Sequence, residues 1–399
     1  MPNFNRAVFC NELEEELREN ILPFWMTQTV DRVNGGFYGA LTNDLKIHNE
    51  VPRSAILCAR ILWTYAGAFR RYGDEEYLSM ARWAYDYLRR IFWDSEYGGV
   101  FWTVDYQGRP AYERKHHYAQ AFAIYGLTEF YRATQEPESL AMAQELFRLL
   151  EKYAFDPELG GYIEGRSRKW ETLEDMRLSE RDLNCRKSMN TLLHILEAYT
   201  NLLRVWEDAR LKQQHAALIN IFLTRIVNNS TGHLRLFFDD DWHSLLDHIS
   251  FGHDIEASWL LVEAAEAQAE PALITRTREA AVKIAKAVYM DGLQEDGSLP
   301  YESGPKGVVD PLRAWWVHAE AAVGFFNAYQ ISQQETFANS AYRCWEYIQD
   351  KFVDRTYGDW FKRLNQDGAP EEGAYKTGPW ECPYHHSRAC FEMIDRLRE

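Results

Sequence analysis

Three histidines lie in stretches of sequence that are otherwise apolar enough to form buried helices. His194 lies within SMNTLLHILEAY, His253 near the start of FGHDIEASWLL, and His385 within WECPYHHSRAC. A single histidine on an apolar helix face is usually a hydrogen-bonded core residue, but three that converge are harder to explain by packing. Because the ordinary pKa of imidazole is about 6.5, histidine is well suited to move protons near neutral pH. These three are therefore candidate general acid and base groups.

Other polar residues occur in the same apolar setting. Arg60 lies between apolar neighbours in ILCARILW, where an arginine needs a partner. Glu256 follows His253 by three residues and shares its helix face, which predicts that its carboxylate orients the imidazole and raises its basicity. Comparable positions are occupied by Tyr118, Asn190, Trp316 and Glu320. If the fold brings these residues together, the histidines can transfer protons beside the fixed positive charge of Arg60.

The common signatures of metal and nucleotide sites are absent from the sequence. It contains no HxH or HExxH spacing, no GxxxxGK[ST] loop and no GxGxxG after a strand. A GxSxG nucleophile elbow is also missing. We therefore expect neither a bound metal nor a cofactor.

Composition and charge narrow the possible partners. The 399 residues carry a formal charge of −16, which argues against a nucleic acid or an anionic membrane surface as partner. No apolar run is long enough to span a membrane, and the first residues, MPNFNR, do not resemble a secretion signal. Six scattered cysteines indicate reduced thiols in the cytoplasm. Aromatic residues make up 15% of the chain, which suits sugar stacking and the filling of a large core equally well.

A repeat supplies the elements that must position these residues. Segments that combine glycine with aromatic residues, such as GGFYGALTNDLK and GGVFWTVDYQGRP, return six times at intervals of 61 to 72 residues. Their alternation of aromatic and polar residues, with DG or QG turns, predicts short β-hairpins or extended loops. The glycines that mark the repeat are Gly35, Gly98, Gly160, Gly232, Gly297 and Gly358.

Between the hairpins the apolar spacing becomes helical. Each repeat contains one helix that is apolar nearly all round, such as YAQAFAIYGLTEFYRA, and one with a single charged face, such as SLAMAQELFRLLEKYAF. Two helices in each of six repeats predict an all-α toroid of six inner and six outer helices, forming a single domain over residues 1–399. An open superhelix of helix pairs has the same periodicity and stays an alternative. In a closed ring the hairpins gather at one mouth, where a site is expected.

Several of these motifs resemble those of the cellobiose 2-epimerases, within the N-acylglucosamine 2-epimerase superfamily. The resemblance runs almost end to end, from GGFYG through KHHYAQAFAIY and SFGHDIEASWLL to GPWECPYHHSRAC. It implies an (α/α)6 barrel and a cofactor-free sugar epimerase or isomerase that acts on reducing-end aldoses. A D-mannose 2-epimerase is a close relative that fits equally well. A monomer or homodimer acting on a small sugar is expected.

The resemblance also assigns roles to residues. It implies that His253 and His385 are the acid/base pair, that His194 is a further active-site histidine, and that Arg60 binds substrate. The remaining positions that it implies are Glu256, Tyr118, Asn190, Trp316, Trp380 and, in a loop, Asp182. The chain departs from the disaccharide epimerases at Cys58, where asparagine is usual, and at His386-Ser387, where Asn-Gly is usual. Both positions are candidates for reshaping the sugar subsites.

The chemistry of C2 inversion explains why two histidines are needed. The C2 proton of an aldose is acidic only beside a free aldehyde, so the ring must open before a base can form an enediolate. Two histidines on opposite faces of C2 then invert it, while Arg60 stabilises the developing oxyanion. Return of the proton to C1 instead gives a ketose, so an aldose–ketose isomerase stays an alternative. A glycoside hydrolase, using two carboxylates such as Glu256 and Glu320, and a carbohydrate-binding protein are the alternatives of other classes.

Overall fold

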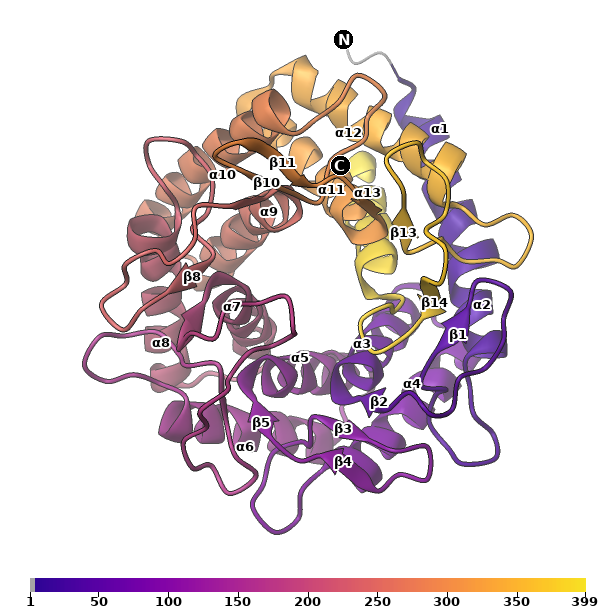
Figure 1. Ribbon diagram of the computed structural model, residues 1–399, viewed down its shortest axis with the longest axis vertical. Helices are drawn as coiled ribbons and strands as arrows, with labels where there is room; N and C mark the ends of the chain where they lie inside the picture. Colours follow the sequence, from indigo (N-terminus) through magenta and orange to yellow (C-terminus); the bar gives the residue numbers. More distant parts are fainter. Residues whose placement is uncertain (1–3) are drawn as a thin grey trace.

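The inner helices form a closed ring around a central axis (Figure 1). The computed structural model describes residues 4–399. In this ring each helix contacts the next, and the last contacts the first. The inner helices are α3 (Ala55–Tyr72), α5 (His117–Thr134), α7 (Met189–Leu203), α9 (Phe251–Gln268), α11 (Trp315–Ser332) and α13 (Tyr384–Arg398).

A second ring of helices packs around the first (Figure 1). Five positions of the outer ring are single helices, and the N-terminal segment completes the ring by packing against α13. The single helices are α4 (Glu75–Tyr87), α6 (Pro137–Tyr153), α8 (Ala209–Ile221), α10 (Pro271–Asp291) and α12 (Glu335–Tyr347). The N-terminal segment consists of α1 (Arg6–Glu15), η1 (Glu16–Ile21) and α2 (Leu22–Gln28). Short π-helical turns extend three outer helices: η2 (Leu88–Phe92), η3 (Phe222–Ile226) and η4 (Ile348–Phe352).

Burial explains why the two kinds of helix take these places. Helix α11 is buried at every residue from 315 to 328, so it must be surrounded by protein. Helix α6 buries only a stripe of residues spaced three or four apart and exposes its charged face. The predicted toroid of inner and outer helices is confirmed, and the assignment of apolar segments to the inner ring was correct.

Short strands join each repeat to the next at one end of the ring. The strand that precedes each inner helix pairs with a strand of the following repeat. The pairs are β2 (Arg53–Ser54) with β3 (Thr103–Val104), β5 (Lys115–His116) with β6 (Gly165–Arg166), β7 (Lys187–Ser188) with β8 (Phe237–Phe238), β9 (Ile249–Ser250) with β10 (Glu302–Gly304), β12 (Arg313–Ala314) with β13 (Arg363–Leu364), and β14 (Tyr375–Thr377) with β1 (Leu41–Thr42). Two further strands, β4 (Pro110–Tyr112) and β11 (Gly307–Asp310), extend the sheets at β3 and β10.

The last of these pairs decides between a ring and an open superhelix. Leu41 of β1 pairs with Thr377 of β14, so a strand near the start of the chain bonds to one near its end. Helix α13 also contacts α3. The ring is therefore closed, and the superhelix alternative is wrong.

The hairpins are anchored to the ring by buried ion pairs. In the second repeat, Lys115 of β5 lies 2.9 Å from Asp94 of the glycine turn, and both are buried. At Gly99 in that turn φ is +76°, and a Cβ would lie 2.8 Å from the Oε1 atom of Gln120, so only glycine fits. Equivalent pairs join Arg53 to Asp31, Lys187 to Asp156 and Lys376 to Asp354. Each pair connects a turn to the strand that leads into an inner helix.

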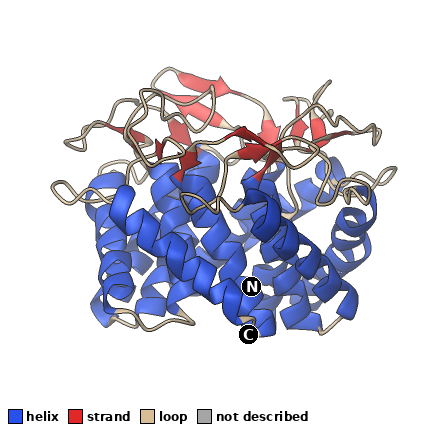
Figure 2. Cartoon of the chain, turned by 90° about the horizontal axis from the view of Figure 1, so that it is seen from below, coloured by secondary structure: helices blue, strands red, loops and turns tan. Residues whose placement is uncertain are grey.

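Figure 2 shows the consequence of this arrangement for the shape of the molecule. Strands and long loops gather at one end of the ring, and helices fill the other end. Because a strand leads into each inner helix, the first turns of these helices face the loop end, which we call the mouth. Among residues 4–399, no helix combines the length and apolarity that crossing a membrane requires.

Candidate active site

Two of the three candidate histidines contact the same tryptophan at the mouth. His253 lies in the first turn of α9, and His385 lies in the first turn of α13. The ring centroid of Trp316, from the first turn of α11, lies 4.8 Å from that of His253 and 5.5 Å from that of His385. The packing of the successive inner helices α9, α11 and α13 therefore brings together His253 and His385, which are more than 130 positions apart in sequence.

The third histidine lies on α7, the inner helix next to α9. The ring of His194 is 4.9 Å from that of Tyr118 and 4.7 Å from that of Phe122. His194 is close enough for its charge to act on both His253 and His385. The predicted convergence of three histidines is thus present in the structure.

Burial keeps all three imidazoles neutral. It lowers the pKa of His194 to about 4. Burial, and then the charge of His194, lower the pKa of His253 to about 3. For His385, burial and then the charges of Arg60 and Arg388 lower the pKa well below the ordinary value. At neutral pH each ring therefore has an unprotonated nitrogen that can accept a proton.

The carboxylate that orients each histidine differs from the sequence-based prediction. Within residues 4–399 His253 has no carboxylate partner; its Nδ1 atom lies 2.7 Å from the hydroxyl oxygen of Ser250. Glu256 instead accepts a hydrogen bond of 2.6 Å from Arg388. The prediction that Glu256 orients His253 is wrong, since a buried carboxylate takes the nearest cation. The other two histidines do have carboxylate partners: Nδ1 of His385 lies 2.7 Å from Oε1 of Glu320, and Nδ1 of His194 lies 2.9 Å from Oε2 of Glu197.

Arg60 is a buried arginine that forms no ion pair with any carboxylate of residues 4–399. It donates from Nη2 to the hydroxyl of Tyr118 at 2.8 Å and from Nη1 to the sulfur of Cys382 at 3.6 Å. Its guanidinium carbon lies 4.2 Å from the ring centroid of Phe122, and its Nε atom has no partner among the described residues. The partner that the sequence led us to expect is therefore a phenol and a thiol. Neither group is an anionic carboxylate, so the positive charge of Arg60 can stabilise an oxyanion.

Aromatic and amide groups line the rest of the candidate site. The half-buried ring of Trp380 lies 5.9 Å from that of Tyr118 and 6.0 Å from that of Trp102. Asn190, in the first turn of α7, has a buried Oδ1 atom without a partner among the described residues. Trp102 was not predicted from the sequence, because it lies in a hairpin that reads as an ordinary aromatic repeat.

Asp182 lies apart from this group in its contacts. It belongs to the loop between β6 and β7, where Oδ2 accepts 2.8 Å hydrogen bonds from the backbone nitrogen and the hydroxyl of Ser179. Its charge reaches Tyr301 at the mouth. The carboxylate of Asp182 therefore stabilises its own loop.

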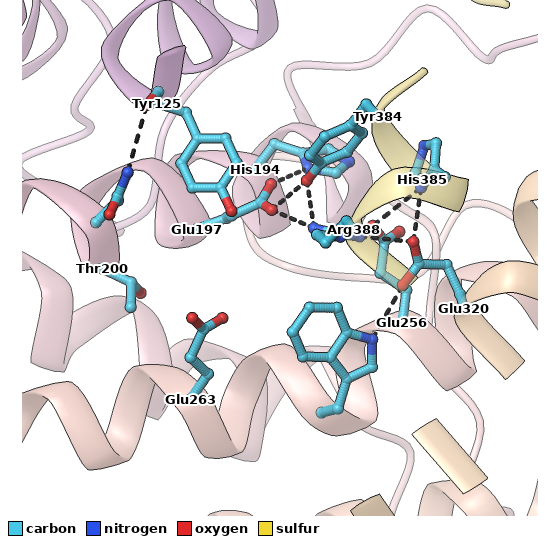
Figure 3. A network of polar contacts seen from close by, with 12 residues as sticks. Tyr125, His194, Glu197, Thr200, Glu256, Glu263, Glu320, Tyr384, His385 and Arg388 are labelled. Carbon is cyan, nitrogen blue, oxygen red and sulfur yellow. Dashed lines mark hydrogen bonds and ion pairs between the residues drawn. The ribbon is translucent and has the colours of Figure 1, made fainter. Parts of the chain in front are cut away.

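A buried network below the histidines includes three residues that the sequence-based prediction missed (Figure 3). Arg388 of α13 is its centre, and Glu197 and Tyr384 bond to it. The signal for Arg388 was the same as for Arg60, a cation inside the apolar segment SRACFEMI. Glu197 follows His194 by three residues, which is the spacing that drew attention to Glu256.

One group of side chains in residues 4–399 has the donor types of a metal site. The potential ligand atoms of Glu256, Glu320 and His385 lie within 4.8 Å of one another. However, Nη2 of Arg388 lies 2.6 Å from Oε1 of Glu256 and 2.7 Å from Oε1 of Glu320. The guanidinium thus occupies the position where a metal ion would have to bind. The positive charge that balances this cluster is therefore that of Arg388.

The two departures from the disaccharide epimerases do not face the site. Cys58 is buried and its thiol donates to the carbonyl of Ala84 in the outer helix α4. His386 is buried, with Nε2 2.8 Å from Asp359 and its ring 5.0 Å from that of Trp360. Cys58 and His386 therefore do not line the candidate site directly, because both side chains point into the packed wall of the ring. An effect of these positions on the sugar subsites stays a prediction.

The fold and this arrangement define an α/α-barrel whose mouth holds neutral histidines beside an unpaired arginine, which suits proton transfer at a polar substrate. The chain belongs to the N-acylglucosamine 2-epimerase (GlcNAc 2-epimerase) family, whose profile matches residues 36–389. This confirms the resemblance found in the motifs.

Individual relatives agree with that assignment. The cellobiose 2-epimerase of Bacteroides fragilis is 46% identical over 97% of this chain and 99% of its own length. That of Dictyoglomus turgidum is 41% identical over 98% of this chain and 99% of its own. A solved structure of cellobiose 2-epimerase from Bacillus thermoamylovorans has a TM-score of 0.93 at 41% identity, covering 98% of this chain and all of that one. The protein is therefore a carbohydrate epimerase, a sugar 2-epimerase.

More distant structures share the fold alone. A D-mannose isomerase has a TM-score of 0.85 at 21% identity, covering 99% of both chains. A GH76 α-mannanase of Bacteroides thetaiotaomicron has a TM-score of 0.63 at 11% identity, covering 99% of this chain and 96% of that one. The glycoside hydrolase alternative therefore has support only at the level of the fold.

Proposed function

We propose that this epimerase inverts C2 of the reducing-end glucose of a β-linked disaccharide such as cellobiose, with His253 and His385 as the two acid/base groups. The observation that carries the proposal is the pair of neutral imidazoles that both contact Trp316, with ring centroids 4.8 and 5.5 Å from its centroid. Relatives that are 35 to 46% identical over nearly the whole chain are cellobiose 2-epimerases, which supports the choice of substrate.

The reaction needs no group beyond the side chains of the site. After the sugar ring opens, one histidine takes the C2 proton, and the C–H electron pair forms a C1–C2 double bond. The aldehyde oxygen then becomes an oxyanion, which Arg60 stabilises together with the hydroxyl of Tyr118. The other histidine returns a proton to the opposite face of C2, and the double bond reverts to the aldehyde. His194, Asn190, Trp380 and the network around Glu320 and Glu256 hold the open chain and the bases in place.

The cellular compartment, the domain organisation and the oligomeric state of the enzyme are also proposals. All six cysteines are unpaired and buried, which supports a reducing compartment such as the cytoplasm. The closed ring of helices supports a single catalytic domain, acting as a monomer or a homodimer.

Isotope labelling tests the proposed reaction. Incubation with cellobiose in D₂O should place deuterium at C2 of both the recovered cellobiose and its mannose-configured epimer, observed by ¹H and ¹³C NMR. The proton taken by a histidine exchanges with solvent, at least in part, before it is returned. Parallel incubations with D-glucose and D-mannose test the monosaccharide alternative.

Other labelling patterns would contradict this reaction. Early formation of a ketose with deuterium at C1, and mannose-configured product only later, would favour an aldose–ketose isomerase. Release of free glucose with C2–H intact would indicate a hydrolase.

Chelation tests the expected independence from metals. Dialysis against EDTA should leave the rate of epimerisation unchanged, because Arg388 occupies the position between Glu256 and Glu320 that a cation would take. Enzyme dialysed against buffer alone is the control. Loss of activity that returns when Mg²⁺, Mn²⁺ or Zn²⁺ is added would show that the cluster binds a metal after all.

A further inference from the structure

Arg388 connects two of the three histidines through a continuous chain of hydrogen bonds (Figure 3). On one side, Nη1 donates to Oε1 of Glu197, whose Oε2 atom lies 2.9 Å from Nδ1 of His194. On the other side, Nη2 donates at 2.7 Å to Oε1 of Glu320, which lies 2.7 Å from Nδ1 of His385. The two histidine–carboxylate pairs thus share one guanidinium, although they come from α7, α11 and α13.

The network is buried and dominated by negative charge. Glu197, Glu256, Glu320 and Arg388 are each at most 3% exposed, so none of their charges is screened by bulk water. Burial opposes ionisation of Glu197, but the charge of Arg388 and the contacts with His194 and Tyr384 together outweigh it and lower the pKa of Glu197 to about 2. Burial, with the charge of Glu320, raises the pKa of Glu256 to about 8. Burial also raises the pKa of Glu320, but the charge and hydrogen bond of Arg388 and the hydrogen bond of Trp259 oppose this shift. With the proton of the cluster on Glu256, the carboxylates of Glu197 and Glu320 share the cation Arg388.

The contacts of Glu320 show that it is a hydrogen-bond acceptor at both oxygens. Oε2 accepts from the indole nitrogen of Trp259 at 3.0 Å, and Oε1 accepts from Arg388. Indole and guanidinium nitrogens only donate. An ionised Glu320 therefore takes the proton of His385 Nδ1, and Nε2 of that ring keeps its lone pair. The same reasoning applies to His194 and the ionised Glu197.

We propose that Arg388 is a positioning residue that joins the pairs His194–Glu197 and His385–Glu320 into one unit and holds both imidazoles with the proton on Nδ1. This inference rests on the proposed function, because it states how one base of that reaction, His385, and the nearby active-site residue His194 are prepared. When His385 takes the C2 proton, the adjacent carboxylate stabilises the imidazolium, as expected for a carboxylate–imidazole pair.

His253 provides the internal contrast. Its Nδ1 atom faces the hydroxyl of Ser250, which can donate or accept. The tautomer of His253 is therefore not imposed by a carboxylate. The three histidines are therefore of two kinds. His194 and His385 have their tautomer set by carboxylates that Arg388 joins, whereas His253 can carry its proton on either nitrogen.

Arg388→Lys tests the proposal without removing the buried positive charge. A single ammonium cannot donate to both pairs as the fork of a guanidinium does. We expect kcat to fall about 10²-fold, the order that general acid–base catalysis contributes, while KM for cellobiose changes little. The charge of Arg388 also lowers the pKa of His194 and of His385. A compact ammonium that pairs with one carboxylate lies farther from the other histidine–carboxylate pair, so it acts less strongly on the histidines and their pKa values rise. The acid limb of the kcat–pH profile should therefore move to higher pH, by about one unit.

Arg53→Lys is the matched control, because Arg53 is equally buried and pairs with Asp31 outside the site. This variant should lose stability without a shift of the acid limb. If folded Arg388→Lys enzyme has the wild-type acid limb, or loses kcat only in proportion to its unfolded fraction, the positioning role is refuted. Wild-type enzyme that fails to epimerise cellobiose would instead refute the proposed function.

Glu197→Gln tests the connection even if Arg388→Lys does not fold. Glutamine keeps the shape of Glu197 but removes its charge, so the charge of Arg388 is less compensated and the pKa of His385 falls. The acid limb should move to lower pH, although Glu197 does not touch His385. Glu164→Gln is the control, because Glu164 is equally buried and bonds to the start of α7 through Ser188 and Thr191. An acid limb that is the same in both variants and the wild type would overturn the coupling.

Discussion

Replacement of either His253 or His385 by asparagine is expected to lower kcat at least 10²-fold, within the range of about 10²–10⁴ that a general acid or base contributes. Asparagine keeps a polar atom near the position of Nδ1, so the contact of residue 385 with Glu320 and that of residue 253 with Ser250 can persist. The loss should therefore come from the missing Nε2 lone pair. Initial rates of cellobiose epimerisation, measured by NMR, check this.

Exchange of the C2 proton in D₂O distinguishes the role of His253 from that of His385. If each histidine serves one face of C2, each single variant should still exchange the C2 proton of one epimer and not of the other. The two variants should retain opposite epimers. Loss of exchange with both epimers in a single variant would indicate one base for both faces, and near-normal turnover in either variant would refute the pair.

His386→Gln is a matched control for this experiment. His386 is the next residue after His385 and is equally buried, but its Nε2 atom bonds to Asp359 in the wall of the ring. Glutamine can place its amide near that Nε2 position. Folded His386→Gln enzyme should keep a kcat close to that of the wild type.

Replacement of Arg60 by methionine is expected to lower kcat by about 10²–10³, as the loss of an oxyanion-stabilising group does in other enzymes. No carboxylate of residues 4–399 pairs with Arg60, so its charge is buried without compensation. Methionine fills similar space beside Phe122 and carries no charge. The melting temperature should therefore not fall, even though activity does.

Tyr118→Phe is the companion variant, because it removes the hydroxyl that accepts from Arg60 and leaves the guanidinium in place. A smaller loss of kcat is expected than for Arg60→Met. If Arg60→Met retains activity within tenfold of the wild type, or unfolds at a much lower temperature, Arg60 has a structural role instead.

The fold could be predicted because its signals are local. The six returns of glycine with aromatic residues and the difference between all-apolar and one-faced helices depend on neighbouring residues only. Two helices in each repeat cannot bury their apolar faces alone, so they must pack against the next repeat. Closure was harder to predict, because the pairing of Leu41 with Thr377 joins segments more than 330 residues apart.

The candidate site was predicted in part. His194, His253, His385 and Arg60 stood out because polar residues are rare in buried helices, and the structure brings them together at the mouth. Arg388 met the same criterion and was overlooked. Asp182 had only a loop context, and its carboxylate bonds to Ser179 in the same loop.

The sequence by itself determined the ring of paired helices and the buried positions that carry polar side chains, since both follow from periodicity along the chain. Only the tertiary structure decided which charges pair. Glu256 lies one helical turn from His253 yet bonds to Arg388, and the carboxylate of His385 comes from Glu320 on another helix. The physical reason is that a buried charge is stabilised by the opposite charge closest in space. In a closed ring that neighbour lies on a different helix, at a distance the sequence does not encode locally.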